Sequence, residues 1–444
     1  MDFKTRNMIT LMTTVIRWHG VWPIGAWRIY GAIGVACWLS LLVVQPLWAA
    51  DFTVNTKFDG ADSDLTDGLC LNVLVEAGGA CTLRAAIQQA NATLAPDTIH
   101  LPAGVYVLTL ENELDAAEDA GASGDLDITG NIVIEGAGAD VTIIEAHDDL
   151  NDRVLHLVGD DAVLGLNRVT VRNGNTTGLA TGTRDGGGIL VGGGKLDAFE
   201  LVVSDSQSPS FGGGIMFIGV NSSVLHRCTI HGNAATGTNG RGGGIFHGQN
   251  YLLTLANCTI SDNEATSRGG GIDVSNNSNL IVLLNTTVAN NRLTGDPEEG
   301  AGIYIGNNTD LHIFSSLIAD NVAQGNVPND CYGQIDVLDH SLVEAPAASD
   351  ACRVALDGEN VNSLFGADDP QLGPLVNNGG TLPTHALLEG SIAIDAGSPL
   401  DPGSGGRACY GMDVRGQLRP ARLACDMGAF ELPQFLFVPT LQKQ

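Results

Sequence analysis

Short apolar runs separated by glycine and asparagine recur through the middle of this 444-residue chain. The motif Gly-Gly-Gly-Ile occurs at 186–189, 212–215, 242–245 and 269–272, and Gly-Ala-Gly-Ile occupies 300–303. A second motif, an apolar residue followed three places later by Asn, ends at Asn233, Asn263, Asn291 and Asn321. Each motif isoleucine precedes the next motif Asn by 18 or 19 residues, whereas the stretch from that Asn to the following glycines varies from 6 to 9. One rigid stretch and one elastic loop per unit are typical of a solenoid, whose stacked strands must keep their register.

The apolar runs have the character of strands rather than helices. Leu252–Leu255 and Asn279–Leu284 are short and rich in leucine, isoleucine and valine, and turn-forming residues bound them. Glycine triplets allow positive φ at a corner, and stacked asparagines can hydrogen-bond from one unit to the next. We therefore predict an all-β, single-stranded, right-handed parallel β-helix over residues 98–340. Its structural ladder is expected at Asn233, Asn263, Asn291 and Asn321.

Caps are expected at both ends, because an open solenoid has exposed strand edges. Leu83, Ile87, Ala90 and Leu94 fall on one face of a helix for which Thr82 is a suitable N-cap, so residues 51–97 are predicted to form the N-terminal cap. The first coils are expected at Thr98–Leu101, Val105–Leu110, Ile132–Glu135 and Val141–Ile144, with Asp115–Asp127 as a protruding loop. Residues 341–431 are expected to form an irregular, disulfide-bearing C-terminal cap, followed by an apolar tail over 432–444.

The N-terminal 50 residues have the pattern of an export signal. Lys4, Arg6, Arg17 and Arg28 precede a charge-free run from Ile29 to Ala50. Cleavage after Ala50 would release a secreted chain that begins at Asp51. Without cleavage the run is long enough to anchor the protein in a membrane, so a membrane is a partner only in that case.

Charge and cysteine content support an extracellular or cell-surface location. The net charge of the whole chain is −29. Residues 51–444 contain 17 Lys and Arg and 49 Asp and Glu, so the net charge without residues 1–50 is −32. Nucleic acid is therefore excluded as a partner, since phosphates need a basic surface. Three local disulfides are predicted for an oxidising compartment, namely Cys70/Cys81, Cys331/Cys352 and Cys409/Cys425. Cys228 and Cys258 occupy equivalent places in successive units, about 4.8 Å apart, and form either stacked thiols or a fourth disulfide.

Three segments resemble known modules. Asp67-Gly68-Leu69-Cys70 with 81–87 and Ala90-Asn91 resembles the CSLREA domain, with Ala85 at the position of the glutamate. The segments 370–375, 377–381, 384–387, 394–397, 413–416 and 425–431 resemble the choice-of-anchor Q domain. The central repeats are similar to those of polymorphic outer membrane proteins. The resemblance implies a secreted or surface β-helix, usually without an assigned activity.

A candidate cation site lies near the N-terminal cap. Asp59, Asp62, Asp64 and Asp67 fall within nine residues, and carboxylates at this density suit Ca²⁺, the one cofactor that the sequence suggests. The spacing does not fit an EF-hand loop, and a solvated acidic loop is the alternative.

Candidate catalytic residues are present, but their spacing selects no set. The possible bases are Arg241, Arg268 and His247, and the possible carboxylates are Asp262, Asp273, Asp296, Glu298 and Glu299. Tyr251 and Tyr304 could line one face as sugar-stacking rings. In the C-terminal segment, His385, Asp395, Asp413, Arg415 and Glu431 form either a site or a polar network that holds the cap.

Two functions remain at this point. The first is a non-catalytic scaffold for adhesion, surface structure or contact with extracellular or cell-envelope glycans. The second is a polysaccharide lyase or glycoside hydrolase that uses a β-helix groove. A carboxylate and arginine cluster on one face would favour the enzyme, and a smooth face of Asn, Ser and Thr would favour the scaffold.

Overall fold

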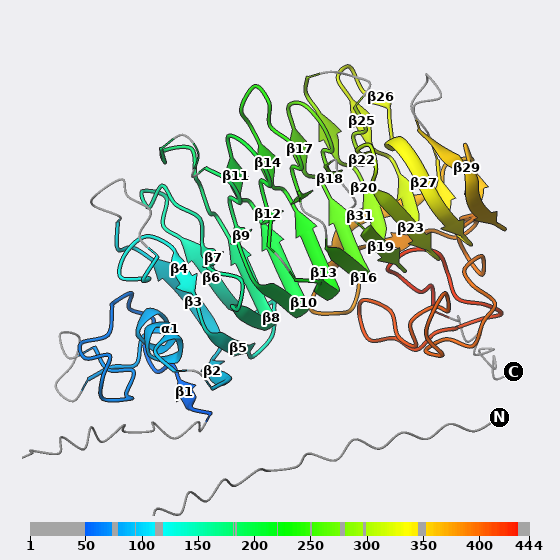
Figure 1. Cartoon of the computed structure of the whole chain (residues 1–444). Coiled ribbons are helices and arrows are strands. Elements are labelled where there is room, and N and C mark those ends of the chain that lie inside the picture. Colours follow the sequence, from blue (N-terminus) through cyan, green and yellow to red (C-terminus); the bar gives the residue numbers. More distant parts are fainter. Residues whose placement is uncertain are drawn as a thin grey trace, which may run out of the picture. The chain divides into compact units, whose positions relative to one another are not determined.

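The computed structural model describes residues 49–72, 79–93, 95–111, 119–180, 182, 184–219, 221–248, 251–275, 280–295, 299–344 and 352–433. Most of the predicted export segment and of the apolar tail lies outside these residues. The described residues belong to one compact unit, in which parallel strands stack coil upon coil along a single axis (Figure 1). Within the described part of the chain, no helix has the length and hydropathy needed to cross a bilayer.

One face of the coil consists of three-residue strands that mostly begin at a motif isoleucine, and we call it the Gly-motif face. Its strands pair in parallel and in register with the next coil. They are β4 (Leu126–Ile128), β7 (Leu155–Leu157), β9 (Ile189–Val191), β12 (Ile215–Phe217), β15 (Ile245–His247), β18 (Ile272–Val274) and β22 (Ile303–Ile305). Their first and third residues are buried in the core, because alternate side chains of a strand point to opposite sides.

The second and third faces are formed by longer strands that bend, or break, at a corner. The second face contains β1 (Asp51–Thr53), β2 (Asp97–Leu101), β5 (Asn131–Gly136), β19 (Leu280–Leu284), β23 (Asp310–Phe314), β27 (Cys331–Asp339) and β29 (Cys352–Val361). The third contains β3 (Gly104–Leu108), β6 (Thr142–Ala146), β20 (Thr287–Ala289), β24 (Leu317–Ala319), β28 (Leu342–Val343) and β30 (Leu364–Phe365). Four strands contribute to both, β8 (Val163–Arg172), β10 (Lys195–Ser204), β13 (Ser223–His231) and β16 (Leu252–Ser261). The stacked strands thus continue to Phe365, into the segment that sequence assigned to the C-terminal cap.

A column of left-handed backbone conformations marks the corner between these two faces. The residues with positive φ are Arg168, Glu200, Arg227, Asn257, Asn285, Ser315, His340 and Asn362, one in each successive coil. The corner before the Gly-motif face instead uses the first glycine of each triplet. In Gly242, for example, φ is +62° and an added Cβ would lie 2.3 Å from the carbonyl oxygen of Ile245. Glycine is therefore required there by both conformation and space.

Asparagines form a hydrogen-bonded ladder at a further corner. The side-chain amide of Asn233 donates to Oδ1 of Asn263 (3.0 Å), Asn263 donates to Asn291 (2.9 Å), and Asn291 donates to Asn321 (2.9 Å). Each of these accepting Oδ1 atoms also accepts a hydrogen bond from the backbone N–H of the ladder asparagine in the preceding coil. Beside this ladder runs a small sheet of two-residue strands, β11 (Gln207–Ser208), β14 (Ala234–Ala235), β17 (Glu264–Ala265), β21 (Arg292–Leu293), β25 (Val322–Ala323) and β26 (Val327–Pro328).

The N-terminal helix covers the first coils (Figure 1). It is α1 (Leu83–Asn91), and the hydroxyl of its N-cap Thr82 accepts the N–H of Ala85 (3.0 Å). Leu83, Ile87 and Ala90 are buried in the continuous apolar core of the coil, as predicted. Leu94 lies outside the described residues.

Four disulfides connect neighbouring segments. Cys70–Cys81, Cys331–Cys352 and Cys409–Cys425 are the three predicted local pairs. Cys228 and Cys258 are the fourth pair, so they are bonded rather than stacked as free thiols. They are in-register partners on β13 and β16 with a Cα separation of 4.5 Å, which brings the two sulfurs within bonding reach.

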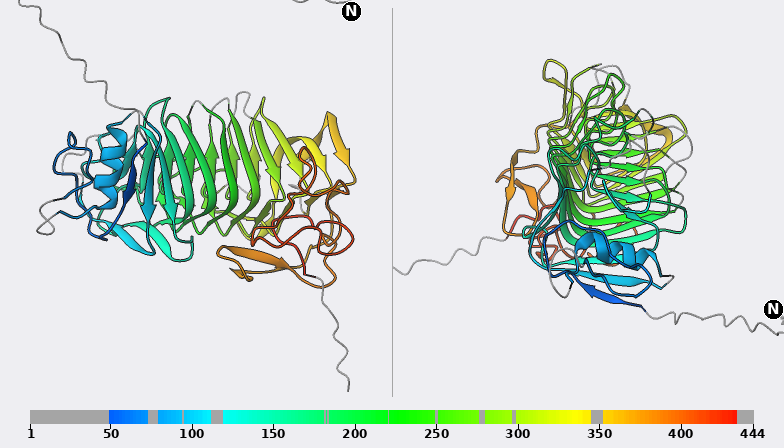
Figure 2. Two further views of the ribbon diagram at one scale, coloured as in Figure 1. Left: turned by 90° about the horizontal axis from the view of Figure 1, so that it is seen from below. Right: turned by 90° about the vertical axis from the view of Figure 1, so that its left-hand side faces the viewer.

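The irregular C-terminal segment lies along the side of the coil. After β30 the chain forms a hairpin of β31 (Leu372–Asn377) and β32 (Pro383–Leu387), then turns without regular structure (Figure 2). Its polar contacts with the coil include outward hydroxyls of the third face, such as Thr229 with the carbonyl of Pro383 (2.7 Å) and Thr259 with Thr384 (3.0 Å). They also include side chains of the corner column, such as Asn257, whose amide donates to the carbonyl of Met412 (2.9 Å). We call residues 366–433 the lateral module.

The Asp-rich stretch before β5 differs from the predicted protruding loop. Residues 112–118 are outside the described part, but Asp125 and Asp127 are buried, and Asp127 is the central residue of β4. A three-residue strand with only two apolar residues has too little periodicity to be recognised from sequence.

Candidate functional site

The central residue of each Gly-motif strand points away from the core, and register brings these residues into one line. We call this line the outward row. It runs through Asp127, His156, Leu190, Met216, Phe246, Asp273 and Tyr304. The start of β27, whose later residues belong to the second face, pairs with β22 and adds Tyr332 beside Tyr304. Its chemistry changes along the axis from an acidic and histidine end, through an apolar middle that packs separately from the core, to an Asp and Tyr end.

A second line of residues lies directly before the glycine motifs, and we call it the motif column. Its members are Asp185, Phe211, Arg241, Arg268 and Glu299. Phe211, Arg241 and Arg268 pair in parallel with one another, coil by coil. Two guanidinium groups are thus fixed side by side at the edge of the outward row.

Arg268 is the centre of a polar cluster at the Tyr end. Its Nη1 donates to the hydroxyl of Tyr304 (2.9 Å), and its Nε lies 3.5 Å from Oδ2 of Asp273. The guanidinium carbon is 4.4 Å from the centre of the Tyr304 ring, within the range of a cation–π contact. Arg241 lies over the ring of Phe211 (5.4 Å), which in turn stacks on Phe246 (4.7 Å). The cluster therefore alternates cations and aromatic rings.

Burial controls the protonation of this cluster. It raises the pKa of Asp273 to about 6, although the charge of Arg268 and a hydrogen bond from Ser275 act in the opposite direction. Burial also lowers the pKa of Arg241, and the like charge of Arg268 adds to that effect. Asp273 has no exposed side-chain surface, whereas Arg268 retains 16%. The guanidinium, not the carboxylate, is the group that solvent or a ligand can reach.

Asp273→Asn is predicted to change the pH dependence of stability. The folded protein holds the Asp273 proton up to about pH 6, whereas the unfolded chain releases it near 3.8. The contribution of this group to the free energy of unfolding is therefore fully present below pH 3.8. It falls by up to about 3 kcal/mol as the pH rises to about 6. The neutral, isosteric amide removes this loss. In thermal unfolding across pH 4–7, the melting temperature of Asp273→Asn should rise relative to that of the wild type as the pH rises. The control Asp161→Asn, which changes an exposed carboxylate, should show no such trend. Parallel profiles for Asp273→Asn and the wild type would contradict the prediction.

A polar hollow adjoins the end of the outward row. Tyr304 stacks on Tyr332 with ring centres 5.1 Å apart and planes 7° apart. Tyr332 forms part of the wall of a surface hollow of about 480 Å³, together with Asn308, Asp310, Gln334, Asp336 and Arg353. Amides, carboxylates and a guanidinium beside an aromatic ring are groups suited to recognising sugar hydroxyls.

The structure brings together four of the predicted catalytic candidates. The charges of Arg268 and Glu299 both act on Arg241 and on Asp273, and Arg241 and Asp273 act on each other. His247 does not join them, because its Nε2 contacts the carbonyl of Tyr251 (2.8 Å) and burial lowers its pKa to about 4. Asp262 occupies a turn with φ of 55° beside Asn263, while Asp296 and Glu298 lie outside the described residues.

Asp59 makes different contacts from the other three predicted calcium ligands. Its carboxylate pairs with the buried Arg84 (2.7 and 3.2 Å) and accepts the backbone N–H groups of Thr109 and Leu110. Asp62, Asp64 and Asp67 accept local N–H groups in exposed turns. Calcium binding by these residues stays a prediction. Within the described residues, the groups with three ligand atoms mutually within 4.8 Å are Asp119/Asp127/His156 and Asp320/Glu344/Asp369.

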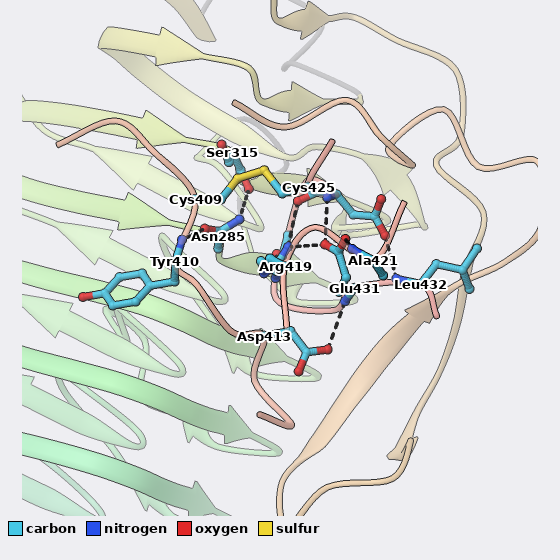
Figure 3. Close-up of polar contacts among 12 residues, drawn as sticks. Asn285, Ser315, Cys409, Tyr410, Asp413, Arg419, Ala421, Cys425, Glu431 and Leu432 are labelled. Atoms are coloured by element: carbon cyan, nitrogen blue, oxygen red, sulfur yellow. Dashed lines mark hydrogen bonds and ion pairs between the residues drawn. A yellow bond between two sulfur atoms is a disulfide. The ribbon is translucent and has the colours of Figure 1, made fainter. Parts of the chain in front are cut away.

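The polar residues of the lateral module are engaged in holding it together. His385 contacts Ser261 on the coil (2.8 Å) and the carbonyl of Gly373 (2.7 Å). Asp413 pairs with Arg415 (2.6 Å), and Glu431 pairs with Arg419 (3.0 Å). Figure 3 shows Arg419, Glu431 and Asp413 beside one another, with the Cys409–Cys425 disulfide nearby. Asp395 accepts the N–H groups of Leu423 and Ala424. These contacts favour the structural interpretation of this set.

Sequence reasoning missed Tyr332, Asp127 and His156 as members of one line. A usable signal exists for part of it, since the residue after each motif isoleucine and the residue before each glycine motif recur at constant spacing. Asp127, His156 and Tyr332 lie in strands without the glycine motif, so only the register of the strands places them.

Comparison with known proteins supports the fold. Residues 154–341 match the family model described as a right handed beta helix region. Together with the stacked strands, this match establishes the predicted right-handed parallel β-helix. A search of curated protein sequences found no match.

Three solved structures are similar at low identity. Pectate lyase Pel9A aligns over 86% of this chain and 96% of its own, with 15% identity and a TM-score of 0.49. Carrot pectin methylesterase aligns over 62% and 83%, with 17% identity and a TM-score of 0.34. The A-module of the Azotobacter vinelandii mannuronan C-5 epimerase AlgE6 aligns over 64% and 89%, with 15% identity and a TM-score of 0.35. These similarities are too low to bear on function.

Proposed function

We propose that this protein is a secreted or cell-surface β-helix scaffold that contacts extracellular or cell-envelope glycans through the Tyr end of the Gly-motif face. The observation that carries the proposal is the stacked pair of Tyr304 and Tyr332, which connects the arginine cluster to the polar hollow. A sugar ring placed in the hollow could lie against Tyr332 while its hydroxyls meet amide, carboxylate and guanidinium groups.

Burial of the carboxylate favours binding over catalysis. A glycoside hydrolase needs two carboxyl groups that both reach the scissile bond. Asp273 is covered, and its contacts with Arg268 and Ser275 orient the arginine from below. Arg241 and Arg268 are partly exposed at this cluster, and guanidinium groups bind sugar hydroxyls without cleaving the sugar.

A polysaccharide-degrading enzyme is the second candidate, and two observations favour it. Carboxylates and arginines do gather on a single face of the β-helix, in the combination expected of a lyase or hydrolase. The raised pKa of Asp273 is also a property of general acids. Movement of Arg268 would be required to uncover this carboxyl group.

The remaining sequence expectations support an extracellular location in this proposal. The disulfides suit an oxidising compartment, and a net charge of −29 argues against nucleic acid as a partner. We propose CSLREA-like and choice-of-anchor-Q-like modules at 51–97 and 341–431, with the repeats at 98–340 between them. Export of the chain by residues 1–50, with or without cleavage, belongs to the same proposal.

Tyr332→Ala tests the glycan contact. In affinity electrophoresis or calorimetry against a panel of neutral and acidic polysaccharides, the wild type should bind at least one member. Loss of one stacking ring costs about 1.4 kcal/mol, so binding should weaken roughly tenfold. Tyr251→Ala is the matched control, because Tyr251 is also partly exposed but lies away from the hollow. No binding by the wild type, or equal affinity in Tyr332→Ala, would contradict the proposal.

The same panel separates the two candidate functions. Incubation of the wild type with each polysaccharide, with and without Ca²⁺, should release no reducing ends or unsaturated products. Product release that Arg268→Ala abolishes would instead establish the enzyme.

A further inference from the structure

We propose that Asp119, Asp127 and His156 form a binding site for a divalent first-row transition-metal ion at the N-terminal end of the outward row. The three ligand atoms lie mutually within 4.8 Å. Nδ1 of His156 is 3.2 Å from Oδ1 of Asp127 and 3.9 Å from Oδ1 of Asp119. This site is separate from the proposed glycan contact and does not depend on it.

Strand register holds the two inner ligands in place. Asp127 is the central residue of β4, and His156 is its in-register partner on β7. The other oxygen of Asp127, Oδ2, accepts the N–H of Gly121 (2.9 Å), which fixes the orientation of the carboxylate. Gly192 follows β9, the strand that pairs with β7, and it leaves space for the imidazole of His156. A Cβ at this position would lie 2.9 Å from Nε2 of His156. Two of the three ligands are therefore preorganised.

The third ligand gives access to solvent. The side chain of Asp119 is 53% exposed, whereas that of Asp127 is fully buried and that of His156 is 17% exposed. An ion can thus enter from the Asp119 side and reach the buried pair. Three protein ligands leave positions for water or another ligand, as in open metal sites.

Several acidic side chains and one arginine surround His156. Asp119, Asp125, Asp127 and Asp152 all face the ring, and Arg153 is the cation that faces it. Arg153 itself pairs with Asp125 (3.0 Å) and lies 4.0 Å from Asp152. Because Arg153 is engaged by Asp125, the carboxylates of Asp119 and Asp127 supply the negative charge that a divalent cation would neutralise.

The ligand set selects the kind of metal. The imidazole suits Zn²⁺, a borderline ion, and the two carboxylates also suit Mn²⁺, a harder one. Ca²⁺ prefers six to eight oxygen ligands and gains nothing from a histidine nitrogen. We therefore expect Ca²⁺ to occupy the all-carboxylate group Asp320/Glu344/Asp369 when both kinds of ion are present.

The experiment is isothermal calorimetry of the purified, untagged protein with Zn²⁺, in buffer containing millimolar Ca²⁺ to occupy carboxylate-only groups. Electron paramagnetic resonance of added Mn²⁺ provides a second readout. The wild type should bind one equivalent. His156→Ala should raise the Kd for Zn²⁺ at least tenfold. Asp119→Asn should do the same, and its exposed position leaves folding intact.

His147→Ala is the matched control. Nδ1 of His147 lies 3.6 Å from a single carboxylate, that of Asp149, and the side chain is about half exposed. It should leave the one-equivalent binding unchanged. Absence of a one-equivalent site in the wild type, or its retention in both His156→Ala and Asp119→Asn, would overturn the proposal.

Discussion

Glu431→Ala is expected to destabilise the lateral module by about 3–5 kcal/mol, because it leaves a buried guanidinium without its counter-ion. Arg419 has no exposed side-chain surface, and its Nη1 lies 3.0 Å from Oε2 of Glu431 (Figure 3). The carboxylate also accepts the backbone N–H groups of Ala421 and Asp426. All three donors lose an acceptor in the variant, in a region that water reaches poorly.

Calorimetric unfolding and hydrogen exchange would measure this loss. The amides of the lateral module should exchange faster in Glu431→Ala, while those of the coil interior remain protected, since each coil depends mainly on its neighbours. Glu389→Ala removes an exposed carboxylate from the same module and should change stability by less than about 0.5 kcal/mol. Equal effects of the two substitutions would disprove the role given to the Arg419–Glu431 pair.

Asn263→Ala is expected to cost about 3 kcal/mol or more, because several buried polar groups lose partners together. Oδ1 of Asn263 accepts both the backbone N–H and the side-chain amide of Asn233. Its own amide donates to the carbonyl of Ile230 and to Oδ1 of Asn291. The alanine satisfies none of these groups, and the cavity it leaves adds to the cost.

Hydrogen exchange gives a local test of the ladder. The backbone amide of Asn233 should lose protection in Asn263→Ala, and the midpoint of thermal unfolding should fall. Asn221→Ala is the control, since Asn221 is exposed and its side-chain amide donates to the carbonyl of Asp160 at the surface. If Asn263→Ala is no less stable than Asn221→Ala, the ladder does not stabilise the coil as described.

Part of the candidate site could be anticipated from sequence. Arg241 and Arg268 precede glycine motifs, and Asp273 follows a motif isoleucine, so regular repeats imply that they meet on one face. The burial of Asp273 beneath Arg268 and the stacking of Tyr304 on Tyr332 could not be foreseen, because they depend on how side chains of three coils fill one space. The hollow beside Tyr332 is lined by a turn that contains Asn308 and by residues of β27 and β29, and no repeat in the sequence reveals how these segments meet.

The amino-acid sequence alone determined the coil, its Asn ladder, the helix at Leu83–Asn91 and the three local disulfides. Each depends on residues at short or constant spacing, where periodicity and turn preference act directly. Only the tertiary structure decided that the last segment lies along the coil and that Asp119, Asp127 and His156 meet. Contacts such as Thr259 with Thr384 and Thr287 with Ala429 join residues more than a hundred positions apart, and no local pattern encodes them. Such contacts arise from the shape of two finished surfaces, which exist only once the coils have stacked.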